Sequence, residues 1–367
     1  MQARSRVCAV LAAALTFALS ALAHADDIPS PTRARHYETV GDFAEAATDL
    51  ERQTEALEGP TAEEVSRGRA WIERALTYHV ALGDATAALR DARSLARWTV
   101  DRDRVAEAEL DAATVWQRAR RWTESARFYE GWLRRHARDT NPRLRVRALT
   151  ELGDARRESG DATRASEAYR RAMVTAPRTQ DAGDTPGDPW LARARFWSVE
   201  PDYQRFMARE LPPATDLTTR HAYDTWVQRS LTPFVQLQRA ELERLTGRLR
   251  EVIEPHEPEW EIAAFHHLAA MYERFGRLID TVPVAPDIAR NPDLLDAYRA
   301  FREPTFGEMF VHQAAEGYQR CLPRANRVPW TGTWTRRCEE SLATLDPWRF
   351  PRADEFAPTP DQGLASR

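Results

Sequence analysis

The residues best suited to chemistry in this sequence are two adjacent histidines, His266 and His267. With Glu261 or Glu273 they could be considered as ligands of a metal ion. Two ligands on one face of a helix are usually four positions apart, whereas neighbouring side chains point about 100° apart. We therefore expect one imidazole to pack between helices and the other to meet solvent, and we predict no metal site.

Recognisable motifs for catalysis and cofactor binding are missing from the sequence. It contains no Gly-x-Ser-x-Gly turn, which presents a nucleophilic serine, and no Gly-x-x-x-x-Gly-Lys loop, which binds phosphates. The many Asp and Glu residues fall in arginine-rich segments with helical periodicity, where solvated helix faces explain them. We therefore predict a protein that is not an enzyme, with no catalytic residue and no cofactor.

Two cysteines, Cys321 and Cys338, follow the single early Cys8. In an oxidising compartment an isolated pair of this kind predicts one disulfide bond. We expect helices over residues 306–322 and 333–345, and an antiparallel arrangement of these helices would bring the two sulfurs together. A metal site with two cysteine ligands is the alternative, but no histidine lies between them to complete it.

The first 25 residues have the features of a secretory signal peptide. Arg4 and Arg6 precede an apolar run over residues 7–22, and Ala23 and Ala25 offer the small side chains that a signal peptidase reads. A membrane anchor is the alternative, but this run is shorter than the roughly 20 residues of a spanning helix. We predict cleavage after Ala25 and a periplasmic location, with secretion or outer-membrane association as alternatives. No later stretch predicts a transmembrane segment.

The charged residues give little sign of a nucleic-acid partner. The chain has 52 basic and 56 acidic residues, a formal net charge of -4, and every basic residue is arginine. Removing Arg4 and Arg6 with the signal peptide makes this balance 50 minus 56, or -6. Binding to nucleic acid needs a clustered basic surface, which the sequence does not show. We therefore predict protein partners.

The elements that position these residues are predicted to be pairs of antiparallel helices. The best example has its turn at Gly160-Asp161. Its two helices carry small and apolar residues at the positions where they would touch: Leu149, Leu152, Gly153, Ala165, Tyr169 and Ala172, with Pro177 closing the second helix. No strand pattern of useful length occurs, so the predicted fold class is all-α.

Similar turns occur at residues 41, 83 and 120, at intervals of 42, 37 and 40 residues along the chain. A small residue follows each turn at the same distance, which lets the two helices approach closely. These residues are Ala46, Ala88, Ser125 and Ala165. The segment from Arg35 to Pro177 resembles the tetratricopeptide (TPR) superfamily, whose repeat is 34 residues long. The resemblance implies a TPR-like α-solenoid over residues 26–178.

The rest of the chain is predicted to be helical with two irregular segments. A Gly- and Pro-rich linker covers residues 179–189, and residues 351–367 form a disordered tail. Between them we expect a helical region over residues 190–290, with a long helix capped by Thr232 and an atypical repeat, and C-terminal helices with the disulfide over residues 291–350. The apolar stripe of the long helix, which packs on neighbouring helices or alternatively forms a dimeric coiled coil, contains Val235, Leu242, Leu245, Leu249 and Val252.

First helices line the inner groove of a TPR solenoid, so the repeat spacing predicts which side chains face a partner. The predicted groove residues are Gln117, Arg118, Arg147, Thr150, Asp154 and Arg157. Two guanidinium groups, from Arg147 and Arg157, would suit an acidic segment or a chain terminus of the partner.

The second half, over residues 218–355, is similar to exported repeat proteins of myxobacteria and their relatives, including those of adventurous gliding machinery. The segments that carry the resemblance are residues 260–264, Met271-Tyr272 with Phe275, residues 282–286, residues 296–299, Tyr318 with Cys321, Trp334 with Cys338, residues 345–347 and Phe350-Pro351. It implies a periplasmic scaffold in an envelope-spanning complex, without catalysis.

Two other functions stay open from the sequence. One is an envelope enzyme or accessory domain that acts on peptidoglycan, although no separate catalytic module is visible. The other is a carbohydrate-binding protein, because exposed indoles can stack on sugars. The tryptophans whose exposure would distinguish it from a scaffold are Trp116, Trp132, Trp190 and Trp330.

Overall fold

The computed structural model describes residues 31–57, 61–136, 138–177, 188–302, 308–325 and 332–351, and within these ranges the chain is helical and contains no strand. The predicted all-α class is therefore confirmed for this part of the chain. The predicted signal peptide and almost all of the predicted linker and tail lie outside the described residues. No helix in the described ranges is long and apolar enough to cross a membrane. The chain divides into two compact units, unit 1 ending at Gln180 and unit 2 beginning at Asp181.

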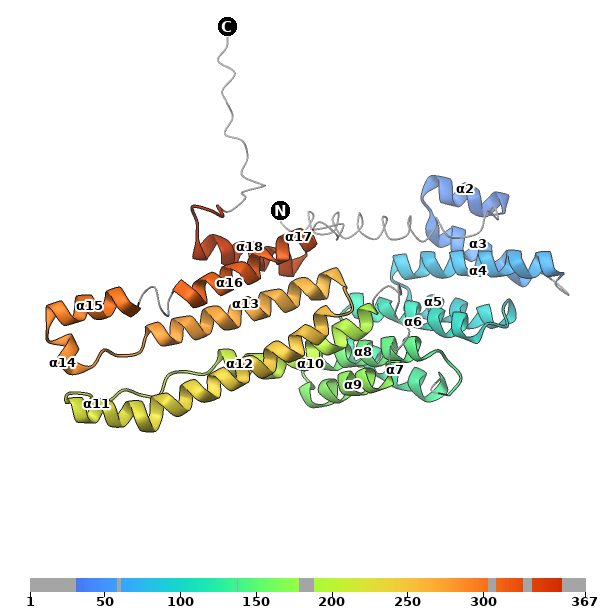
Figure 1. The fold of residues 1–367 in the computed structure, drawn as a ribbon. Helices are drawn as coiled ribbons and strands as arrows, with labels where there is room; N and C mark the ends of the chain where they lie inside the picture. The colour runs from blue at the N-terminus through green and yellow to red at the C-terminus, as the bar shows by residue number, and fades with distance from the viewer. Residues whose placement is uncertain are drawn as a thin grey trace, which may run out of the picture. The chain divides into compact units, whose positions relative to one another are not determined.

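Unit 1 consists of successive helices that pair through short turns (Figure 1). Its helices are α2 (Thr32–Val40), α3 (Phe43–Glu55), α4 (Ala62–Leu82), α5 (Ala85–Ser94), α6 (Arg102–Arg118), α7 (Trp122–His136), α8 (Pro142–Glu158) and α9 (Ala162–Thr175), with a 3-10 turn η1 (Leu95–Arg97) after α5. Each helix packs on the next one in the chain, and the first helices α4, α6 and α8 also contact one another in sequence.

The turn between the two helices of each pair has the same backbone geometry in all four pairs of the described residues. Gly41, Gly83 and Gly160 have φ values of 79, 82 and 86°, and Arg120 takes their place in the third pair with φ of 56°. In each turn this residue donates its amide to the carbonyl three positions earlier, and the next residue donates to the carbonyl five positions earlier. These two bonds form a left-handed helix end, for which glycine is the preferred residue.

The small residue after each turn lies where the two helices of the pair meet. Ala46, Ala88, Ser125 and Ala165 are all buried. In the fourth pair, a Cβ atom added to Gly153 on α8 would lie 2.4 Å from the Tyr169 ring on α9. The close approach of the helices therefore depends on small side chains, as the sequence predicts.

Unit 2 contains longer helices than unit 1, and the segments that join them are less regular. Its elements are α10 (Pro189–Met207), α11 (Arg220–Trp226), a π turn η2 (Val227–Leu231), α12 (Thr232–Ile253), α13 (Pro258–Asp280), α14 (Pro286–Ala289), α15 (Pro292–Arg302), α16 (Glu308–Gln319), α17 (Cys321–Ala325) and α18 (Thr333–Leu345). Helix α13 contacts α10, α12, α16, α17 and α18, and these contacts form the core of the unit.

The long helix α12 begins at Thr232, as predicted, but Thr232 is not its cap. The chain is already helical before Thr232, because α11 continues through η2 into α12, and Leu231 makes no side-chain cap. A π turn is a common way for a helix to accommodate a residue that breaks its hydrogen-bond ladder, and Pro233 lacks an amide donor. Pro233 therefore lies in the first turn of α12, directly after the widened turn η2.

The apolar stripe of α12 is used inside unit 2. Leu242, Leu245, Leu249 and Val252 are buried and belong to the core cluster that includes α10 and α13. This confirms packing on neighbouring helices, the first of the two predicted uses of the stripe.

The two late cysteines lie within bonding distance. The Cys321 and Cys338 sulfurs are 2.18 Å apart, and the Cα atoms are 6.5 Å apart. The prediction of one continuous helix over residues 306–322 is wrong, however. Helix α16 ends at Gln319 and α17 begins at Cys321, so the first cysteine stands at the start of a short helix that packs against α18.

The left-handed turns allow a direct test at Arg120. Replacing it with glycine removes the steric cost of a side chain at positive φ, and we expect Arg120→Gly to stabilise the protein by about 0.5–1 kcal/mol. The reverse change, Gly83→Ala, should destabilise it by about 1 kcal/mol. Urea unfolding followed by circular dichroism measures both, and a loss of stability in Arg120→Gly would contradict the equivalence of the four turns.

The contact between Gly153 and Tyr169 predicts a second pair of variants. Gly153→Ala should lower the free energy of unfolding by about 1–3 kcal/mol, because the new methyl group forces the tyrosine ring away. The control is Gly131→Ala on α7, where the nearest atom to an added Cβ is 3.4 Å away at the end of the Arg135 side chain. That change should raise stability by up to about 1 kcal/mol through helix propensity. Equal effects of the two variants in urea unfolding would refute the close helix contact.

Candidate functional site

The six predicted groove residues differ widely in their exposure. Thr150 and Asp154 on α8 are buried, and Arg147 is 9% exposed. Gln117 and Arg157 are half-buried, and only Arg118 is exposed. Thr150 therefore lies inside unit 1 and offers no surface to a partner, contrary to the prediction.

Most of these side chains have partners within the unit. Arg147 forms ion pairs with Asp111 on α6 at 2.6 Å and with Glu151 at 3.3 Å. The Tyr169 hydroxyl donates a hydrogen bond to Oδ1 of Asp154 at 2.8 Å. The Arg147 guanidinium is thus already paired with carboxylates, and its binding to an acidic segment of a partner stays a prediction.

The other predicted groove residues are also engaged. Gln117 Nε2 donates to the Tyr129 hydroxyl at 3.0 Å, and Arg118 Nη1 donates to the Val80 carbonyl at 3.4 Å. Arg157 pairs with Glu158 at 2.7 Å. Contact of Arg118 or Arg157 with a partner stays a prediction, since both retain some exposure.

A cavity of about 380 Å³ lies on the first helices α4 and α6 and carries strongly acidic side chains. Five carboxylates and one guanidinium group line it: Glu73, Asp101, Asp103, Glu107, Asp111 and Arg104. The guanidinium is paired with Glu73 through Nη2 and Oε2 at 2.7 Å. Asp111 is also paired, with Arg147, so the negative charge left over is that of Asp101, Asp103 and Glu107, and it favours a cationic ligand.

Glu107 is the carboxylate in this cavity whose pKa is raised. Desolvation, together with the nearby Asp111 carboxylate, raises the pKa of Glu107. Its side chain is exposed. A lysine or arginine from another molecule would reduce the repulsion between these carboxylates.

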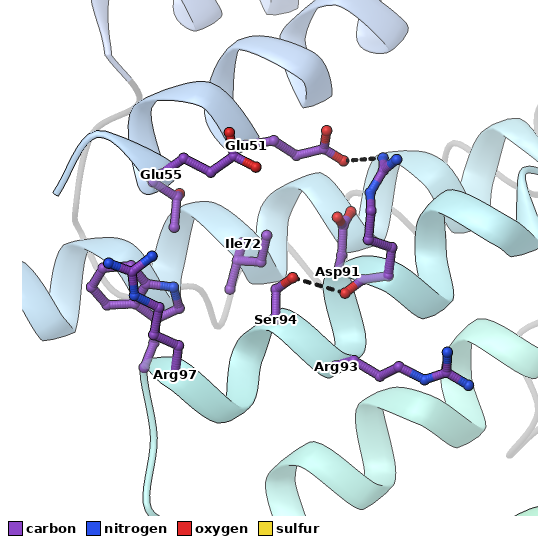
Figure 2. A pocket seen from close by; sticks show the side chains of 10 residues that line it. Glu51, Glu55, Ile72, Asp91, Arg93, Ser94 and Arg97 are labelled. Atoms are coloured by element: carbon purple, nitrogen blue, oxygen red, sulfur yellow. Dashed lines mark hydrogen bonds and ion pairs between the residues drawn. The ribbon is translucent and has the colours of Figure 1, made fainter.

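A second polar cluster joins the first and second helix pairs of unit 1. Glu51 on α3, His79 on α4 and Asp91 on α5 place one ligand atom each within 4.8 Å of one another. His79 Nε2 lies 3.0 Å from Oε1 of Glu51 and 3.7 Å from Oδ2 of Asp91, and Arg90 Nη2 pairs with Glu51 at 2.8 Å. Figure 2 shows the carboxylates of Glu51 and Asp91 beside the same cavity, which has a volume of about 230 Å³.

The two carboxyl groups of this cluster have different proton affinities. Burial and the hydrogen bond with Glu51 raise the pKa of Asp91 to about 9. Desolvation of Glu51 is outweighed by hydrogen bonds with His79, Asp91 and Arg90, which lower the pKa of Glu51 to about 2. The sequence did not point to this cluster, because its members are 28 and 12 positions apart and follow no ligand motif.

The histidine pair on α13 lies in the core of unit 2. His267 is buried, stacks on Tyr203 with ring centres 3.7 Å apart, and places Nε2 2.7 Å from Oε2 of Glu200. His266 is half-buried and not fully in solvent, since it packs near Tyr318 and Trp334. Among the described residues, three side chains that could ligate a metal ion come together around His79 and not around the histidine pair.

Of the tryptophans named for sugar binding, Trp132 is a packing residue, and Trp116 and Trp190 are partly covered. Trp132 is fully buried and donates its indole N–H to the Ala106 carbonyl at 3.0 Å, so it cannot stack on a ligand. Trp116 is half-buried against Phe128, with ring centres 5.4 Å apart, and Trp190 is also half-buried. Trp330 lies outside the described residues.

No protein-family model matches the chain, and no curated protein matches it. A function for this chain must therefore be argued from its own residues. The features that carry such an argument are the repeated turns, the acidic cavity and the polar cluster of unit 1.

The histidine pair predicts how the stability of unit 2 depends on pH. Desolvation, with the neighbouring His267 and Arg337, lowers the pKa of His266 to about 3, although Glu200 acts in the opposite direction. Desolvation also lowers the pKa of His267. An unfolded histidine has a pKa near 6.5, so the unfolded state binds more protons below that pH. We expect stability to be complete above about pH 6.5 and to fall towards pH 3, by up to about 1.4 kcal/mol per pH unit for each histidine.

Urea unfolding of the His266→Gln variant at several pH values measures this dependence. The variant should lose less stability than the wild type between about pH 6.5 and pH 4. His221→Gln, which changes an exposed histidine of the same unit, is the control and should follow the wild type. Parallel curves for wild type and His266→Gln would show that His266 does not cause the acid sensitivity.

Proposed function

We propose that this protein is a non-catalytic scaffold for protein–protein interaction in the bacterial cell envelope. The observation that carries the proposal is the left-handed turn that recurs in four helix pairs of unit 1, each followed by a buried small residue. A repeated helix pair is the building block of TPR-like solenoids, which present extended binding surfaces. A catalytic role has no comparable support in the described residues.

Contacts between successive pairs support a solenoid. One apolar cluster joins α4, α5 and α6, and the next joins residues of α6, α7, α8 and α9. A single pair could not bury its own apolar face, so the pairs depend on one another for a continuous core. Such an arrangement leaves first-helix side chains available for a partner.

The acidic cavity on α4 and α6 defines the partner that we favour. First helices contribute most of its lining, and its side chains carry an excess of carboxylates. We therefore propose that unit 1 binds a basic segment of a protein partner, in place of the acidic segment expected from the sequence. We favour a basic segment because Arg147, which would bind an acidic one, already forms ion pairs with Asp111 and Glu151.

Export to the envelope is part of the same proposal. Its support is the secretory signal predicted for residues 1–25 and the cysteine pair, whose sulfurs are at bonding distance in unit 2. Disulfide bonds persist in the periplasm and are rare in the cytosol. The similarity of the second half to proteins of gliding-type complexes suggests an envelope-spanning assembly as the setting.

Site-specific crosslinking in the producing cells tests the partner and the cavity together. A photo-reactive residue at Thr77, which lines the acidic cavity, should form an adduct with a partner, and the crosslinked peptide should be rich in lysine or arginine. Glu107→Arg should lower the adduct yield by about tenfold, equivalent to roughly 1.4 kcal/mol, because it places a like charge against the partner.

The matched control is Glu167→Arg on α9, which makes the same reversal of charge. Glu167 is exposed and forms an ion pair with Arg170. This variant should leave the adduct yield unchanged. Equal yields for wild type and Glu107→Arg, or an adduct with an acidic peptide, would refute binding of a basic segment. Absence of any adduct at Thr77 together with hydrolysis of cell-wall fragments by the purified chain would refute the scaffold itself.

A further inference from the structure

We propose that Glu51, His79 and Asp91 bind a Zn²⁺ ion between the first and second helix pairs of unit 1. The three side chains come from three consecutive helices, α3, α4 and α5, and their ligand atoms converge within 4.8 Å. One neutral imidazole and two carboxylates form a ligand set that zinc accepts. The site is separate from the acidic cavity and does not depend on the identity of a protein partner.

The distances between the ligand atoms suit a tetrahedral ion. Bonds of about 2.0–2.1 Å from zinc to nitrogen and oxygen place two ligand atoms of a tetrahedron roughly 3.3 Å apart. His79 Nε2 lies 3.0 Å from the Glu51 oxygen and 3.7 Å from the Asp91 oxygen, on either side of that value. Small rotations of these side chains would therefore complete the coordination, without movement of the helices.

Asp91 supplies the observation that points to a ligand. Its side chain is 1% exposed, and no basic or amide donor lies within hydrogen-bond distance of its buried Oδ2 atom; Glu51 is the neighbour with which the carboxyl group can share a proton. Buried polar atoms in proteins are almost always hydrogen-bonded or bound to an ion. This oxygen faces the His79 ring at 3.7 Å, which is too long for a hydrogen bond but leaves room for a metal ion between the two groups.

The position of Asp91 in the second helix pair corresponds to Asp49 in the first, where the buried carboxylate lies beside arginines. Asp49 stands eight residues after the turn at Gly41, as Asp91 does after Gly83, and it is also 1% exposed. Arginines balance the charge of its Oδ1 atom, with Arg52 at 3.3 Å and Arg33 at 3.9 Å, although its Oδ2 atom, like that of Asp91, has no hydrogen-bond partner. At Asp91 the nearest guanidinium, that of Arg90, is instead directed to Glu51. A metal ion would supply the charge that arginine supplies to Asp49.

The cluster is open to solvent on one side. The cavity reaches two of the three ligands, Glu51 and Asp91, whose carboxylates lie beside it (Figure 2). It gives an ion a path to these oxygens and space for a water molecule as a fourth ligand. Arg90 must release Glu51 when the ion binds. Its side chain is 61% exposed, so the guanidinium can turn into solvent at little cost.

Calorimetric titration of Zn²⁺ into the metal-free chain from Asp26 onward, without a polyhistidine tag, tests the proposal. We expect one equivalent of zinc to bind, and Asp91→Asn and His79→Gln should each weaken binding by at least about tenfold. Asp49→Asn matches the first change in burial and repeat position, and His36→Gln removes an exposed histidine of the same unit. Both controls should bind zinc as the wild type does.

Two further measurements separate loss of ligation from loss of folding. Asp91→Asn removes a carboxyl ligand and keeps the shape of the side chain, so the variant should remain as helical as the wild type by circular dichroism. Co²⁺ added to the wild type should give the intense visible absorption of a tetrahedral site, and Zn²⁺ should remove it. The proposal is overturned by absence of zinc binding, by unchanged affinity in folded Asp91→Asn, or by equal losses in Asp49→Asn and His36→Gln.

Discussion

The close contact between the two helices of each pair is the constraint on which unit 1 depends. It requires a left-handed residue at the turn and a small side chain five positions later, and both recur in four pairs of the described chain. The hydrogen bonds of the turn fix this geometry so strongly that Arg120 adopts it despite its Cβ atom. Because neighbouring pairs share apolar clusters, the position of each pair limits the position of the next.

Unit 2 reaches stability by a different route, through one long helix surrounded by others. Aromatic rings from two other helices, Phe196 and Trp334, lie near His267 on α13, and Trp260 of α13 packs on Phe196. The polar groups that this helix buries are compensated: Glu200 lies within hydrogen-bond distance of His267, and Arg324 from α17 pairs with Glu261. Helices α17 and α18 are in turn joined through their cysteines. Compensation of these two groups allows a largely aromatic core to contain an imidazole and a carboxylate group.

Local features of the fold could be predicted from the sequence, whereas features that depend on distant residues could not. The turn at Gly160 and the bounds of α10 and α18 follow from glycine, proline and periodicity, which act over a few positions. The π turn before Pro233 was missed because a proline at that spacing also fits a helix start. Thr150 was placed on a surface because periodicity does not show which neighbours cover a helix face. The site around His79 was missed because its ligands meet only once three helices have packed.

Polar contacts between helix pairs determine the register that apolar contacts leave open. Alanine-rich helix faces can slide on one another at small cost, but a buried carboxylate must remain beside its cations. Glu109 on α6 is buried and contacts Arg93 of the preceding pair at 3.5 Å and Arg135 of its own pair at 3.0 Å. Arg147 on α8 reaches Asp111 on α6 in the same way. A shift of one helical turn would leave these charges buried without partners, and this penalty gives a repetitive, alanine-rich chain a single arrangement of its pairs.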